Sequence, residues 1–177
     1  MLGLGNNIIK GGGAIEELIL TYTSDFTSGV DGWEKYSVDQ GDLALAANQT
    51  IDSSGGWLKC TYDATQTSLS GIQRQIGVPV LAGDRFVEQF TIYIVDDSGK
   101  WDPEGDSDAV SVKHTITNNN LIFGANLDES VTRSGATSNN GLGAADPYII
   151  LQFATADDFP QAGAVFFIKD YTLSIFR

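Results

Sequence analysis

The sequence is poor in the residues that most catalytic and metal-binding chemistry requires. One cysteine and one histidine occur among 177 residues, so no intrachain disulfide can form and no cysteine metal cluster exists. We expect Cys60 to be a small, buried apolar residue. His114 would have to serve any Ser-His-Asp triad alone, and no Gly-x-Ser-x-Gly elbow accompanies it. We therefore predict that the protein is not an enzyme.

Positive charge is also scarce, since 10 Lys and Arg stand against 23 Asp and Glu, for a net charge of -13. Nucleic acid is excluded as a partner because duplex binding needs clustered Lys and Arg. A membrane partner is disfavoured, because no apolar run approaches the roughly 20 residues of a membrane helix. Met1–Lys10 does not read as a secretory signal. The charge suits divalent cations and neutral partners such as sugars and proteins.

Helical periodicity is almost absent, and apolar residues alternate with polar ones instead. One short helix is expected near Ala156–Gln161. The alternation predicts an all-β fold, a two-sheet antiparallel β-sandwich or jelly roll. Its strands are expected near Ile15–Tyr22, Trp33–Val38, Leu43–Ala47, Trp57–Tyr62, Ile72–Ile76, Arg85–Val95, Val110–Thr117, Leu121–Ala125, Tyr148–Thr155 and Ala164–Arg177.

The last of these strands breaks its own alternation. Apolar residues before Lys169 fall on one face of the strand, and those after Asp170 fall on the other. A β-bulge at this point would bring both sets into one core. The two sets are Phe166 and Ile168, then Tyr171, Leu173 and Ile175.

Residues 1–13 form a Gly-rich, nearly uncharged N-terminal arm, and residues 14–177 form the sandwich domain. Gly loses much backbone freedom on ordering, so an ordered arm needs a surface to bind. We expect the arm to anchor in a neighbouring subunit, where each buried side chain could contribute about 1.5–3 kcal/mol. The alternative is that the arm folds back on its own domain. The anchoring side chains would be Leu2, Leu4, Ile8 and Ile9.

Aromatic rings on predicted solvent-facing positions are candidate sugar platforms, because the apolar face of a sugar stacks on a flat ring. The candidates are Trp57, Trp101 and Tyr93. The competing interpretation is that the tryptophans cover loops or line an interface, and Trp33 is expected in the core. Tyr148 is a further ring on a predicted solvent-facing position, and the polar groups that would bind the sugar hydroxyls are Arg85, Gln89 and Gln152.

Three short segments resemble jelly-roll carbohydrate-binding modules. They are Asp25-Phe26 with Gly32-Trp33, the turn Val80–Phe86, and the closing strand Phe167–Leu173. The resemblance covers residues 25–177 and implies a glycan-binding function. It also implies a structural calcium held by Asp25 and Asp170. Lys169 replaces an acidic residue usual in that strand, which opposes metal binding.

The acidic loop Asp96–Asp108 is a second calcium candidate, since calcium takes oxygen ligands from such loops. Its order of acidic residues does not match an EF-hand. A solvated acidic loop is the alternative. No other cofactor is expected.

The start of the chain has a resemblance of its own. Met1–Asn6, followed by Ile8 and Ile9, resembles the opening of small structural proteins of tailed phages, many of them marine. This predicts a virion protein, present in many copies or as a homo-oligomer, that decorates the capsid or forms part of a tail or fibre. Its partners would be other virion proteins. The alternative functions are a carbohydrate-binding module for host glycans and, less favoured, a glycan-cleaving enzyme with two carboxylates.

Overall fold

The computed structural model describes residues 16–37, 48–66, 70–95, 100–101, 109–116, 119–139, 143–145, 147–154 and 160–177, without the side chains of residues 37, 109–123 and 154. The described residues contain strands and turns and no helix, and none of their segments is a helix long and apolar enough to cross a membrane. The strands are β1 (Leu18–Ser24), β2 (Glu34–Ser37), β3 (Gln49–Ser54), β4 (Trp57–Tyr62), β5 (Ser70–Gln75), β6 (Arg85–Ile94), β7 (Ala109–Ile116), β8 (Asn119–Asn126), β9 (Ser130–Ser138), β10 (Tyr148–Ala154) and β11 (Val165–Phe176).

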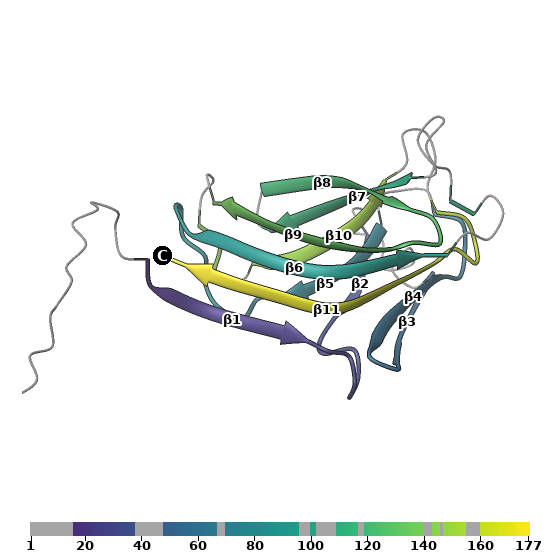
Figure 1. The fold of residues 1–177 in the computed structure, drawn as a ribbon, viewed down its shortest axis with the longest axis horizontal. Coiled ribbons are helices and arrows are strands. Elements are labelled where there is room, and N and C mark those ends of the chain that lie inside the picture. The colour runs from purple at the N-terminus through teal and green to yellow at the C-terminus, as the bar shows by residue number, and fades with distance from the viewer. Residues whose placement is uncertain are drawn as a thin grey trace, which may run out of the picture.

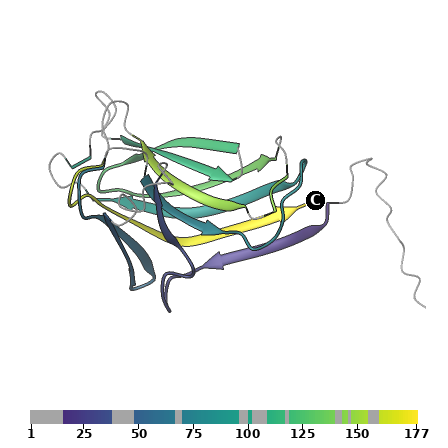
Figure 2. The same ribbon diagram turned by 180° about the vertical axis from the view of Figure 1, so that it is seen from behind.

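The strands form two antiparallel sheets that face each other (Figure 1). Sheet A has the order β3-β4-β11-β6-β9, with β1 paired to the second half of β11. Sheet B has the order β2-β5-β10-β7-β8. Figure 2 shows the whole molecule from behind the view of Figure 1. The predicted all-β sandwich is confirmed.

The core lies between the sheets and follows from the alternation of each strand. In β6 the buried side chains include Phe86, Phe90 and Ile92, while Arg85 and Gln89 face outward. Phe153 of sheet B meets Phe166 of sheet A with ring centroids 4.1 Å apart. Contacts of this kind join the two sheets into one body.

The β-bulge predicted in the closing strand is confirmed. The register between β11 and β6 shifts between Lys169 and Thr172, and Asp170 has a φ of 52°. On both sides of the bulge the apolar side chains are therefore buried. The pairing also allows β11 to contact β4 with its first half and β1 with its second.

The predicted burial of Trp33 and of Cys60 is confirmed, whereas two strands of the structure were not predicted. Trp33 is 3% exposed and Cys60 is fully buried, which raises the pKa of the Cys60 thiol. The sequence did not predict β3 or β9, whose short polar residues carry little apolar signal. The predicted strand Leu43–Ala47 lies outside the described residues, as does most of the predicted helix.

An ion pair fastens the last strand to the turn before β6. The Arg177 guanidinium donates to both carboxylate oxygens of Asp84, at 2.9 and 2.8 Å, and the Asp84 side chain is 1% exposed. Asp84 also accepts from the backbone N–H of Leu81, at 2.8 Å. The Arg177 hydrogen bonds are the main reason that the pKa of Asp84 is lowered.

We predict that Arg177→Ala lowers the thermal unfolding midpoint at neutral pH, because it leaves a buried carboxylate without its cation. A lowered folded-state pKa stabilises above the ordinary aspartate value of about 3.9, and this contribution is lost as the pH falls through the folded value. The difference from the wild type should therefore shrink in acid. Arg85→Ala is the control, since the Arg85–Glu16 pair is exposed and should contribute less. Equal losses in the two variants would contradict the prediction.

Candidate functional site

Aromatic side chains gather on the outer face of sheet A, the face turned away from sheet B. Phe167 of β11 pairs in register with Tyr93 of β6, and both alternate with buried neighbours. Trp57 begins β4, one position beyond the pair formed by Leu58 and Ile168. Three neighbouring strands therefore supply three rings to one surface, which we name the aromatic row (Trp57, Phe167 and Tyr93).

The rings of the aromatic row are in contact. Trp57 and Phe167 have centroids 6.2 Å apart at 81°, an edge-to-face arrangement, and Phe167 and Tyr93 are 6.1 Å apart at 45°. Together with Ser130 they line a hollow of about 330 Å³. All three rings are half-buried rather than fully covered. The arrangement can present an apolar, stepped surface to a ligand.

Hydroxyl groups surround the row on the side of β9. Ser130 pairs in register with Tyr93, and the hydroxyls of Thr91 and Thr132 lie 2.9 Å apart. The Tyr93 hydroxyl donates to Asp128 at 3.0 Å, and this hydrogen bond raises the pKa of Tyr93. Apolar rings beside hydroxyl and carboxylate oxygens can hold a ligand that has both apolar faces and many hydroxyls.

The structure brings together two of the residues that the sequence singled out, Trp57 and Tyr93. It adds Phe167, which was quoted only as part of a motif. The missed signal was the alternation of β11: Phe166 is buried, so its neighbour Phe167 must face outward. An aromatic residue on the outward face of a strand would have been a candidate.

The exposure expected of Trp101 is wrong. Its side chain is 2% exposed, and its ring lies 5.9 Å from that of Tyr62 and 5.4 Å from that of Phe153. Trp101, which lies within the acidic loop Asp96–Asp108, thus closes one end of the core. Burial of this apolar ring at the open end of the sandwich removes its surface from water. A buried ring offers no face to a sugar, so Trp101 is not a sugar platform.

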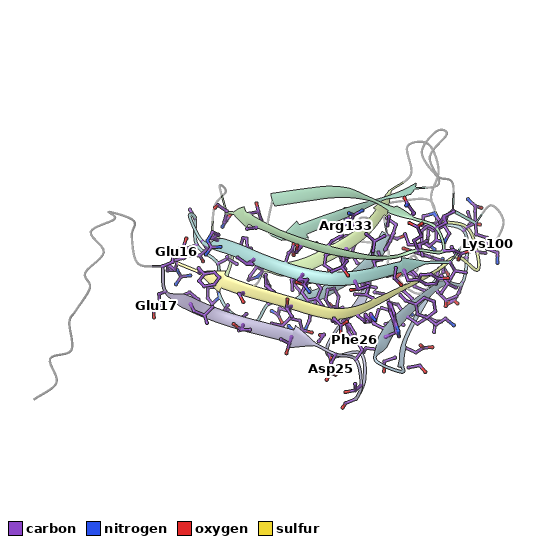
Figure 3. The ribbon with its side chains drawn as sticks, viewed as in Figure 1. Glu16, Glu17, Asp25, Phe26, Lys100 and Arg133 are labelled. Carbon is purple, nitrogen blue, oxygen red and sulfur yellow. The ribbon has the colours of Figure 1, made fainter. Side chains whose placement is uncertain are left out.

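Arg85 and Gln89 lie on the same face of β6 as Tyr93, but Arg85 is at the opposite end of the strand and Gln89 is midway between them. Eight residues separate Arg85 from Tyr93, a distance of about 26 Å along a strand. Arg85 instead pairs with Glu16 and covers the ring of Phe176, 4.5 Å away. Figure 3 shows Glu16 at one end of the molecule and Lys100 at the other.

Two other residues that were predicted to face solvent, Tyr148 and Gln152, lie in β10 of sheet B. Tyr148 is half-buried, and Gln152 is 4% exposed with its Oε1 unpaired. The solvent-facing position expected of Gln152 is therefore wrong. Gln152 is paired in register with Gly71, on the far side of the molecule from the aromatic row.

The predicted calcium ligands Asp25 and Asp170 are brought near each other, because Ser24 pairs with Tyr171. Asp25 accepts from the backbone N–H and the hydroxyl of Thr27, which lowers the pKa of Asp25. Figure 3 shows Asp25 in the loop after β1. Among the described residues, no group of three or more His, Cys, Asp or Glu is placed to hold a metal ion. Calcium binding stays a prediction.

Other predicted sites lie outside the described residues. These include the anchoring residues Leu2, Leu4, Ile8 and Ile9 and most of the acidic loop Asp96–Asp108. His114 lies in β7, but its side chain is not described.

The fold is similar to that of solved carbohydrate-binding modules. The C-terminal family 22 module of Clostridium thermocellum Xyn10B gives a TM-score of 0.57 at 10% identity, over 87% of this chain and 91% of that one. A xylan-binding domain of family 22 gives 0.56 at 10% identity, over 87% and 93%. A family 4 module gives 0.53 at 14% identity, over 86% and 97%. No protein-family model and no curated protein matches the chain. The comparison shows a shared sandwich fold.

Proposed function

We propose that this protein is a carbohydrate-binding module that holds a glycan on the aromatic row without cleaving it. The observation that carries the proposal is the contact of Trp57, Phe167 and Tyr93 on one open sheet face. The described residues that line the hollow include no carboxylate, whereas glycoside cleavage ordinarily needs two. The similarity to carbohydrate-binding modules supports the same function.

The physical basis is the match between a sugar ring and this surface. A pyranose has an apolar C–H face that can pack on Trp57 or Phe167 and lose contact with water. Its edge carries hydroxyls that can bind the oxygens of Ser130 and Thr132. Rigid rings lose little conformational freedom on binding, so more of the contact energy remains as affinity.

We predict that Trp57→Ala weakens glycan binding at least tenfold, the effect of losing a contact worth about 1.4 kcal/mol or more. A glycan array would identify ligands, and titration calorimetry would compare the dissociation constants. The folded state is checked by the thermal unfolding midpoint, which should change little because Trp57 is only half-buried.

Phe176→Ala is the matched control, because Phe176 lies in the same strand as Phe167 but beside Arg85 at the other end. It should bind the glycan as the wild type does. A blank array, or a Trp57→Ala protein with unchanged affinity, would remove the proposal.

A place on a phage virion remains a prediction from the sequence of the arm, residues 1–13. It is compatible with glycan binding, since a virion protein could hold host glycans on one face and neighbouring subunits through the arm. Removal of residues 1–13 should then abolish co-purification with particles and leave glycan affinity unchanged. A variant lacking the arm that still co-purifies with particles would contradict this.

A further inference from the structure

Two lysine side chains, Lys59 and Lys169, lie next to the rings of the aromatic row on the same face of sheet A. Lys59 of β4 pairs in register with Phe167, and Lys169 follows Phe167 by two residues on the same face of β11. Trp57 precedes Lys59 by two residues on β4. The four side chains form a square, with Trp57 and Phe167 on one diagonal and Lys59 and Lys169 on the other. Diagonal neighbours of this kind lie about 7–8 Å apart.

This placement is unusual for a chain with a net charge of -13. The guanidinium groups of Arg74, Arg85 and Arg177 are all engaged by oxygens of their own fold. Within the described residues, no carboxylate lies within ion-pair distance of the Lys59 ammonium. Among the described carboxylates, the one within ion-pair distance of the Lys169 ammonium is that of the adjacent Asp170, with the Nζ and Oδ2 atoms 4.0 Å apart.

The Trp57 ring contacts Lys169. Its ammonium nitrogen lies 4.6 Å from the centroid of Trp57, a cation–π contact. Two like charges on neighbouring strands repel each other, and an anion between them would relieve this repulsion. The positions between the lysines are aromatic, so the residues that the structure describes supply no anion there. The described carboxylates near the row stand on its flanks: Asp52 beside Lys59, Asp170 beside Lys169, and Asp128 on Tyr93.

We infer that the glycan held on the aromatic row is acidic, a uronic acid polymer whose carboxylate binds between Lys59 and Lys169 while its ring packs on Trp57 or Phe167. This rests on the proposed function and specifies its ligand. The net negative charge of the protein does not oppose it at close range, because charges beyond about 8 Å are screened at physiological ionic strength. The two ammonium groups in direct contact decide the selectivity.

The test uses pairs of oligosaccharides that differ only in charge. A β-1,4-linked glucuronic acid hexamer is compared with cellohexaose, and a β-1,4-linked mannuronic acid hexamer with mannohexaose. In at least one pair the acidic member should bind about fivefold more tightly. Lys59→Gln and Lys169→Gln should each reduce that preference about two- to fivefold, as exposed ion pairs do, and high salt should reduce it too.

Lys35→Gln is the control, because Lys35 lies in β2 of the other sheet. It should leave every affinity unchanged. Equal binding of acidic and neutral members, or no effect of the two lysine variants, would overturn the inference and leave the proposed function standing. Binding of neither pair also overturns the inference, whereas the proposed function fails if the full glycan array is blank or if Trp57→Ala binds its glycan as tightly as the wild type.

Discussion

Replacing Gly71 with alanine is expected to destabilise the protein by about 4 kcal/mol or more, enough to remove much of the stability of an ordinary domain. Gly71 is a buried residue of β5 that pairs with Gln152 of β10. A Cβ at this position would collide with the backbone carbonyl of Leu151. Backbone atoms of a central strand cannot turn aside as a flexible side chain can, so β5 and β10 would have to separate.

The measurement is the thermal unfolding midpoint, which should fall by about 8–16 °C for a loss of 4 kcal/mol in a domain of this size. Gly77→Ala is the matched control. Gly77 has a φ of 83°, but nothing lies within 4 Å of an added Cβ. Only the left-handed backbone then opposes alanine, at about 1–2 kcal/mol. A Gly71→Ala protein as stable as Gly77→Ala would show that the two strands are not packed as described.

Phe166→Ala and Phe167→Ala are expected to separate stability from binding at adjacent residues. Phe166 is fully buried and contacts Phe153 across the two sheets, so its loss leaves a cavity and should lower stability by about 3–5 kcal/mol. Phe167 is half-buried in the aromatic row, and its loss should lower stability by only about 1 kcal/mol. Phe167→Ala should instead weaken glycan binding at least tenfold.

Both variants are measured by urea unfolding and by titration with a glycan identified on the array. Phe166→Ala, under conditions where it is folded, should keep most of its affinity, because the outer face of β11 retains its side chains. If Phe166→Ala lost affinity while folded and Phe167→Ala kept it, the aromatic row would not be the binding site.

Alternation along single strands was sufficient to predict the all-β class, the two faces of β6 and the bulge in β11. These are local properties, since the side-chain period of a strand is two whatever it pairs with. The same pattern placed Trp57 and Tyr93 on outward faces, and the structure agrees. It failed for β3 and β9, whose polar residues show little apolar alternation.

Burial at the ends of the sandwich could not be predicted from local pattern. Trp101 lies within the acidic loop Asp96–Asp108 of the sequence, which suggests exposure, yet it closes the core against Tyr62 and Phe153. Gln152 alternates as an outward residue and is nevertheless buried. In both cases the environment comes from segments distant in the sequence.

The sequence by itself determined which side chains of β4, β6 and β11 face the core and which face outward, because the pleat of a strand decides this locally. Only the tertiary structure decided which outward side chains become neighbours. Trp57 and Lys59, Tyr93, and Phe167 and Lys169 come from three separate parts of the chain and meet through the registers of β4, β11 and β6. Register is set by strand pairing across the whole sheet, and no single segment of the sequence specifies it.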